Sequence, residues 1–175
     1  MKNIILTGLM GSGKSSVAIC LKKIFSDFEL VETDVLIIQK EGASINNIFE
    51  EKGEKYFRTI EKQIIDDVLK KENQIISLGG GSLENDFDFE LCKKKSIMFY
   101  LKADSDTLYE RLKTANDRPL LKCENPKEKL QQLLEIREKN YLKADFIIDV
   151  NNIDIVTVSK KIGEIYKNAN RNNKS

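Results

Sequence analysis

Short continuous apolar runs alternate along the chain with longer stretches in which apolar residues recur at helical spacing. The runs predict five strands of the kind that is buried on both faces. The expected strands are 3–7, a short strand at Leu30 and Val31 that ends at Thr33 and Asp34, 74–78, 97–101 and 146–150. Strands of this kind, separated by helices, are typical of a parallel sheet.

The stretches between these runs carry the start and stop signals of helices. Ser44 and Asp104 are suitable N-caps, and Pro126 suits the first turn of a helix. The expected helices are 14–25, a mostly helical region 35–71 broken near Gly42 and Gly53, 104–111, 126–141 and 153–167. The end of the chain, 168–175, is polar, and we expect it to fray.

Together these elements predict an α/β fold, a three-layer α/β/α sandwich around a five-stranded parallel sheet. The 175 residues have the length of one domain, and no linker divides them. Segment 113–125 is polar, contains Pro119 and has no clear period. We expect this segment to form a mobile loop.

Charge and composition exclude several classes of function. Lys plus Arg number 29 and Asp plus Glu 28, a net charge of +1, which argues against binding nucleic acid through bulk charge. The chain contains no histidine, so the commonest general base and metal ligand is missing. Any catalysis must therefore use carboxylates, Lys, Arg, backbone amides or a bound metal.

The cysteines and the apolar runs indicate where the protein acts. Cys20, Cys92 and Cys123 are odd in number and form no CxxC pair, so we expect reduced thiols rather than disulfides or a zinc site. The apolar part of the N-terminus is too short for a signal peptide. No apolar stretch approaches the roughly 20 residues of a membrane span. We expect a cytoplasmic protein that does not bind membranes.

The sequence GLMGSGKS, from Gly8 to Ser15, matches the phosphate-binding pattern GxxxxGK[ST] between a predicted strand and a predicted helix. Glycines let backbone N–H groups turn towards phosphates, and the helix N-terminus adds the positive end of its dipole. Lys14 would reach the β- and γ-phosphates, and the Ser15 hydroxyl would bind Mg²⁺. The predicted ATP·Mg²⁺ site consists of Gly11, Ser12, Gly13, Lys14, Ser15 and Ser16.

This phosphate-binding loop, the P-loop, identifies the phosphoryl donor but not the acceptor, because GTPases, ATPases and small-molecule kinases share it. No NKxD run for reading guanine follows. Polar groups instead stand next to structure breaks, and the ends of parallel strands line the ligand crevice of such sheets. They are Glu32-Thr33-Asp34, 57–61 (FRTIE), Gly79-Gly80-Gly81, 118–121 (RPLL) and 137–141 (REKNY).

In this order, GLMGSGKS, TD, FRxxE, GGG, RPLL and RxxxY resemble the shikimate kinase family over residues 1–166. The resemblance implies a P-loop fold like that of nucleoside monophosphate kinases. It implies a core of 1–32, 62–111 and 126–167, an acceptor-binding segment of about 33–61 and a lid of about 112–125. It also implies a monomer that uses ATP and Mg²⁺ to phosphorylate the 3-hydroxyl of shikimate, in the pathway to chorismate and the aromatic amino acids.

The resemblance assigns the acceptor site. Asp34 resembles the aspartate that accepts a hydrogen bond from the attacking hydroxyl, although a helix cap is the alternative. Arg58 and Arg137 resemble the pair that holds the shikimate carboxylate, and two guanidinium forks suit a planar carboxylate. Glu61, three residues after Arg58, would orient it.

The resemblance also assigns the residues around the transferred phosphate. Gly79, Gly80 and Gly81 resemble a triple glycine whose backbone approaches the acceptor closely. Arg118 resembles a lid arginine that stabilises charge on the transferred phosphate, so that Lys14, Asp34 and Arg118 form the expected catalytic set. Arg111 resembles the arginine that packs on adenine. The segment around 151–152 should lie near the base.

Two positions depart from the family pattern. The family often has Asp where this chain has Glu32, whose longer side chain could still reach Mg²⁺ through a water molecule. Leu78 stands before the triple glycine, where a small hydroxyl residue is common. Neither change touches the acceptor-binding arginines.

Three functions are compatible with the P-loop alone. A shikimate kinase is favoured by the whole set of motifs. A kinase for another small acceptor is the first alternative, with gluconate nearer than a nucleoside monophosphate because gluconate also needs a carboxylate clamp. A nucleotide-binding switch without enzymatic activity is the second, but a pure binder has no need of Asp34.

Overall fold

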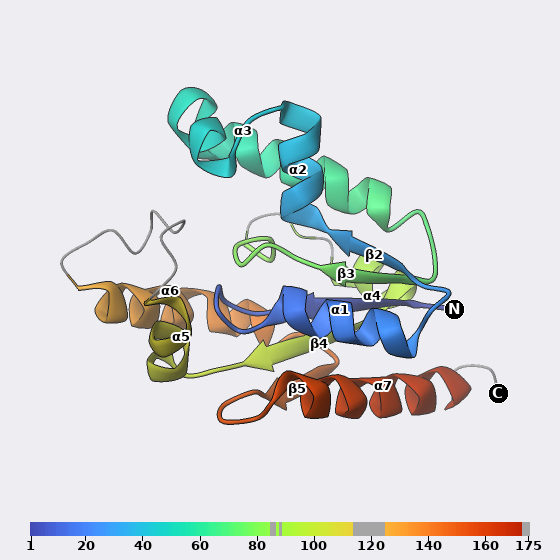
Figure 1. Cartoon of the computed structure of the whole chain (residues 1–175). Helices are drawn as coiled ribbons and strands as arrows, with labels where there is room; N and C mark the ends of the chain where they lie inside the picture. The colour runs from blue at the N-terminus through green and yellow to red at the C-terminus, as the bar shows by residue number, and fades with distance from the viewer. Residues whose placement is uncertain (85–86, 88, 114–124, 173–175) are drawn as a thin grey trace.

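A five-stranded sheet forms the centre of the protein in the computed structural model, which describes residues 1–84, 87, 89–113 and 125–172 (Figure 1). All pairings are parallel, and the strand order is β2-β3-β1-β4-β5. The strands are β1 (Asn3–Thr7), β2 (Glu29–Glu32), β3 (Gln74–Ser77), β4 (Ser96–Lys102) and β5 (Phe146–Asp149). The α/β fold class and the five-stranded parallel sheet are therefore confirmed.

Helices cover both faces of this sheet (Figure 1). In the view of Figure 1, α1 and α7 contact each other in front of the sheet, and α4 and α6 lie behind it. The pair α2 and α3 extends beyond the β2 edge. The helices are α1 (Lys14–Ile24), α2 (Thr33–Glu41), α3 (Ile45–Val68), α4 (Phe89–Lys95), α5 (Ser105–Leu112), α6 (Pro126–Tyr141) and α7 (Ile155–Asn172).

Burial on both faces explains why the inner strands appear in the sequence as continuous apolar runs. β1 and β3 are buried along their whole length, and so is β4 apart from Lys102. In the edge strands β2 and β5, only Val31 and Ile148 are fully buried. The loops at the carboxyl ends of the inner strands therefore start from the most buried part of the described chain.

The helix boundaries follow the signals expected from the sequence. The Ser44 hydroxyl accepts a hydrogen bond from the Asn47 backbone N–H at 3.2 Å, and Asp104 accepts one from Thr107 N–H at 2.7 Å. Gly42 ends α2 with a left-handed φ of 65°, and Gly53 interrupts α3 with a φ of 79°. Both predicted N-caps and both predicted breaks are confirmed.

Most boundaries differ from the predictions by one or two residues, and the differences at β2, α7 and α4 have a physical reason. β2 ends at Glu32, so the strand does not reach Thr33 and Asp34, which form the first turn of α2. α7 continues to Asn172 instead of fraying from residue 168, because Ala169 still packs against the core. α4 was not predicted, because its seven residues are too few to show a helical period.

Some expectations fall partly outside the described residues. Segment 114–124, which contains most of the predicted lid together with Arg118 and Cys123, is one of these gaps. The two cysteines in the described ranges, Cys20 and Cys92, are not joined in a disulfide. Among the described ranges, no helix combines the length and the apolar character needed to cross a membrane.

Candidate active site

A cavity of about 640 Å³ lies where the loops after the carboxyl ends of β1, β2 and β3 meet. P-loop residues 10–17 line it together with Glu32 and Asp34 from the β2–α2 junction and Gly80 after β3. Arg111 and residues 153–155 also belong to its wall. The fold therefore brings the predicted nucleotide-binding residues of the described chain together with Asp34 and the middle residue of the triple glycine.

The P-loop connects β1 to the first turn of α1. Gly13 is the N-cap of α1 and has a φ of 93°, a left-handed conformation that favours glycine. A Cβ on Gly8 would lie only 2.7 Å from the Leu101 carbonyl oxygen, so the loop can pass β4 only without a side chain there. The Lys14 ammonium donates hydrogen bonds to the carbonyls of Gly8 at 2.8 Å and Leu9 at 3.1 Å. Lys14 thus lies folded over the loop that would hold the phosphates.

Ser15 and Glu32 form an oxygen-rich pair beside the P-loop. The Ser15 hydroxyl donates a hydrogen bond to Glu32 Oε2 at 2.6 Å. A hydroxyl and a carboxylate are ligands that suit Mg²⁺, which also keeps water molecules and takes phosphate oxygens. No cluster of three or more metal-ligating side chains occurs in the described part of the chain. The pair therefore fits an ion that arrives with the nucleotide.

Asp34 lies in the first turn of α2, directly beside the triple glycine. The N-cap residue of α2 is Glu32, and Asp34 follows it in the first turn. A Cβ on Gly79 would lie 2.6 Å from Asp34 Oδ1, which means that the missing side chain makes room for this carboxylate. Asp34 also lines the cavity that contains the P-loop. The carboxylate is therefore placed between the phosphate loop and the segment after β3.

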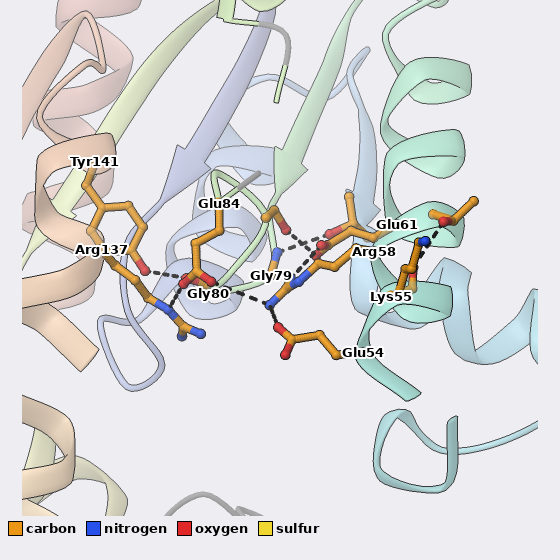
Figure 2. A network of polar contacts seen from close by, with 12 residues as sticks. Glu54, Lys55, Arg58, Glu61, Gly79, Gly80, Glu84, Arg137 and Tyr141 are labelled. Atoms are coloured by element: carbon orange, nitrogen blue, oxygen red, sulfur yellow. Dashed lines mark hydrogen bonds and ion pairs between the residues drawn. The ribbon is translucent and has the colours of Figure 1, made fainter. Parts of the chain in front are cut away.

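Arg58 projects from α3 towards the other end of the triple glycine (Figure 2). Its Nη1 donates a hydrogen bond to Glu61 Oε2 at 2.7 Å, and Glu61 Oε1 accepts one from the Ser82 hydroxyl at 2.6 Å. Burial lowers the pKa of Arg58, but the charge and hydrogen bond of Glu61 outweigh it, so the pKa is raised. Glu61 orients Arg58, as the sequence suggested, and Ser82 fixes Glu61 in turn.

Arg137 reaches the same region from α6 (Figure 2). Its Nε donates a hydrogen bond to Glu84 Oε1, and Glu84 Oε2 lies 3.9 Å from Arg58 Nη2. The two arginines are thus brought close enough to share one carboxylate. Glu84 and Ser82 were not singled out in the sequence, where neither belongs to a recognisable motif.

The third residue of the triple glycine makes room for Arg58. A Cβ on Gly81 would lie 2.6 Å from Arg58 Nη2 and 2.9 Å from Nη1. The central residue, Gly80, accepts a hydrogen bond from the Tyr141 hydroxyl through its carbonyl. Burial raises the pKa of Tyr141, so the phenol stays protonated and can donate this bond. The three glycines therefore connect Asp34, Arg58 and the end of α6.

Arg111 belongs to the wall of the cavity. Its guanidinium donates hydrogen bonds to the carbonyls of Val150 at 2.7 Å and Gly11 at 3.4 Å. Ile153 and Ile155 line the same cavity, so the segment just after 151–152 does lie beside the P-loop. The role of Arg111 on adenine stays a prediction, and Arg118 falls outside the described residues.

Comparisons with known proteins point to one family. A family model described as shikimate kinase matches residues 10–167. The shikimate kinase of Thermodesulfovibrio yellowstonii is 40% identical over 95% of this chain and 96% of its own, and that of Sulfurihydrogenibium sp. is 42% identical over 94% and 96%. The solved structure of shikimate kinase from Acinetobacter baumannii in complex with shikimate is 32% identical, has a TM-score of 0.89, and covers 97% of this chain and 94% of that one.

Proposed function

The chain belongs to the shikimate kinase family, and from this membership and its site we propose that it transfers the γ-phosphoryl group of ATP to the 3-hydroxyl of shikimate. The product is shikimate 3-phosphate, on the way to chorismate and the aromatic amino acids. We place the enzyme in the cytoplasm, where ATP is available. It acts as a monomer, since both halves of the site come from one chain.

One observation carries the assignment of the residues. The triple glycine touches the proposed catalytic carboxylate at one end and the proposed carboxylate clamp at the other, through Gly79 with Asp34 and Gly81 with Arg58. Its middle residue lines the cavity of the P-loop. An acceptor that lies along these glycines would therefore present a hydroxyl towards the nucleotide while its carboxylate contacts the arginines.

On the donor side, the P-loop amides and Lys14 bind the phosphates of ATP. To contact the β- and γ-phosphates, Lys14 must give up its hydrogen bonds to the carbonyls of Gly8 and Leu9. Ser15 and, through a water molecule, Glu32 would hold Mg²⁺, which offsets charge on the phosphate oxygens when bound. Arg111 would contact the base from the side of the cavity.

On the acceptor side, Asp34 orients the 3-hydroxyl by accepting its hydrogen bond. Phosphoryl transfer has a loose transition state, so positioning contributes more than strong basicity. Arg58 and Arg137 hold the carboxylate at the far end of the ring, and Glu61 keeps Arg58 in place. The attack is therefore directed by two anchored ends of one small molecule.

The acceptor is tested by measuring ADP release from Mg²⁺·ATP with shikimate, gluconate, AMP, CMP or no acceptor. We expect shikimate alone to stimulate release, because it combines a ring hydroxyl with a carboxylate at the correct separation. Stimulation by gluconate or a nucleotide would reject the assigned acceptor while keeping the P-loop chemistry. ATP binding without any stimulation would support a nucleotide-binding protein instead.

Gly81→Ala is expected to raise the KM for shikimate about tenfold while the KM for ATP stays the same, because the new Cβ pushes the Arg58 guanidinium aside. The clash is with the end of a flexible side chain, so the melting temperature should fall by less than about 3 °C. Steady-state kinetics and thermal melting measure both. Gly163→Ala is the control, because its Cβ would meet nothing nearer than 3.6 Å. An unchanged KM for shikimate in Gly81→Ala would contradict the contact.

A further inference from the structure

Glu84 presents its carboxylate to Arg58 and Arg137, the two arginines of the proposed carboxylate clamp (Figure 2). One oxygen accepts a hydrogen bond from Arg137 Nε, and the other lies 3.9 Å from Arg58 Nη2. Each oxygen thus faces one guanidinium, which is the arrangement that a bound substrate carboxylate would adopt. The side chain comes from the loop directly after the triple glycine, within the acceptor site itself.

The charged side chains at the clamp carry a net negative charge. Arg58 and Arg137 bring two positive charges, and Glu54, Glu61 and Glu84 lie within 4.0 Å of them with three negative charges. A substrate carboxylate would add a fourth negative charge to this small region. Like charges in a partly buried site repel strongly, so one carboxylate has to leave when the substrate enters.

Glu84 is the carboxylate best able to leave. The Glu61 side chain is only 5% exposed and also accepts a hydrogen bond from Ser82, so it is fixed. Glu54 is 62% exposed and contacts Arg58 alone, at the rim. Glu84 is 23% exposed and is the side chain that bridges both arginines. Its place between them and its access to solvent make it the group that a ligand would displace.

We propose that Glu84 occupies the position of the acceptor carboxylate in the free enzyme and competes with shikimate for Arg58 and Arg137. The proposal rests on the assigned acceptor. Shikimate binding then exchanges one carboxylate for another, and the apparent affinity is weakened by the contact that is given up. A neutral polyol cannot replace the lost charge, so the same contact selects for anionic acceptors.

The test is calorimetric titration of the Glu84→Gln variant with shikimate, beside the wild-type enzyme. The amide keeps the size of the side chain but removes its charge, and we expect the Kd for shikimate to fall about fivefold. The KM for shikimate should fall by the same factor, with the KM for ATP as internal reference. A gain in affinity cannot come from damage to the fold. An unchanged or weaker affinity would overturn the proposal.

Glu54→Gln is the matched control, because it removes an ion pair of Arg58 that does not involve Arg137. Its Kd for shikimate should fall much less than that of Glu84→Gln, because the 62% exposed Glu54 is screened by water, and a gain as large as that of Glu84→Gln would overturn the specific role of Glu84. In a crystal structure of the wild-type complex, Glu84 should lie away from both guanidinium groups, and finding it still between them would overturn the displacement. Wild-type enzyme that binds ATP but not shikimate would instead reject the proposed function.

Discussion

Asp34→Asn is expected to lower kcat by about 10³-fold, the size of effect that a positioned proton acceptor contributes. Asparagine has the shape of aspartate and fits the space that Gly79 leaves open, so the fold and the cavity should be retained. Its amide has one acceptor oxygen and no negative charge, so it holds the 3-hydroxyl less firmly towards the γ-phosphate. The KM for ATP should change little, because the phosphates are held by the P-loop.

This expectation is checked by steady-state kinetics with both substrates varied. Asp27→Asn makes the same chemical change at an exposed position outside the cavity and should match the wild type. A kcat of Asp34→Asn within about tenfold of the wild-type value would show that Asp34 does not orient the acceptor.

Arg137→Ala is expected to raise the KM for shikimate about 100-fold, the loss that corresponds to a pair of charge-assisted hydrogen bonds. The change also leaves Glu84 without its hydrogen-bond partner, and its free charge would repel the incoming carboxylate. Arg58→Ala should have a similar effect on KM but should also destabilise the protein. It leaves Glu61, of which only 4% is exposed, without its cation.

Kinetics with shikimate varied at saturating ATP measure this loss. Arg171→Ala, an exposed arginine near the end of α7, serves as the control. The KM for ATP should stay within about twofold of the wild type in all of these variants, because the arginines of the clamp lie outside the cavity wall of the P-loop. A KM for shikimate that did not rise in either arginine variant would exclude the carboxylate clamp.

The strands and the P-loop could be predicted because their signals are local. β1 and β4 read as continuous apolar runs since both of their faces are buried. The caps at Ser44 and Asp104 each depend on a partner only three residues away. The loop GLMGSGKS could be interpreted because it needs only a strand before it and a helix after it.

The detailed contacts of the site depend on the tertiary fold and could not be predicted in the same way. Glu84 and Arg137 are 53 residues apart, and no spacing rule connects them. The hydroxyl that the family pattern suggested at position 78 is another case, because Leu78 is buried. The buried Thr33 hydroxyl, from the start of α2, accepts a hydrogen bond from Gly79 N–H at 3.1 Å, a contact between residues 46 apart in the sequence.

The position of β1 in the sheet has a consequence for how the enzyme forms during synthesis. β1 leaves the ribosome well before its partners, which are β3, beginning at Gln74, and β4, ending at Lys102. Until β4 has emerged, the P-loop has no complete sheet to fix its backbone amides. A nascent chain that ends before β4 should therefore be unable to bind ATP, and nucleotide binding should appear in one late step as the centre of the sheet closes.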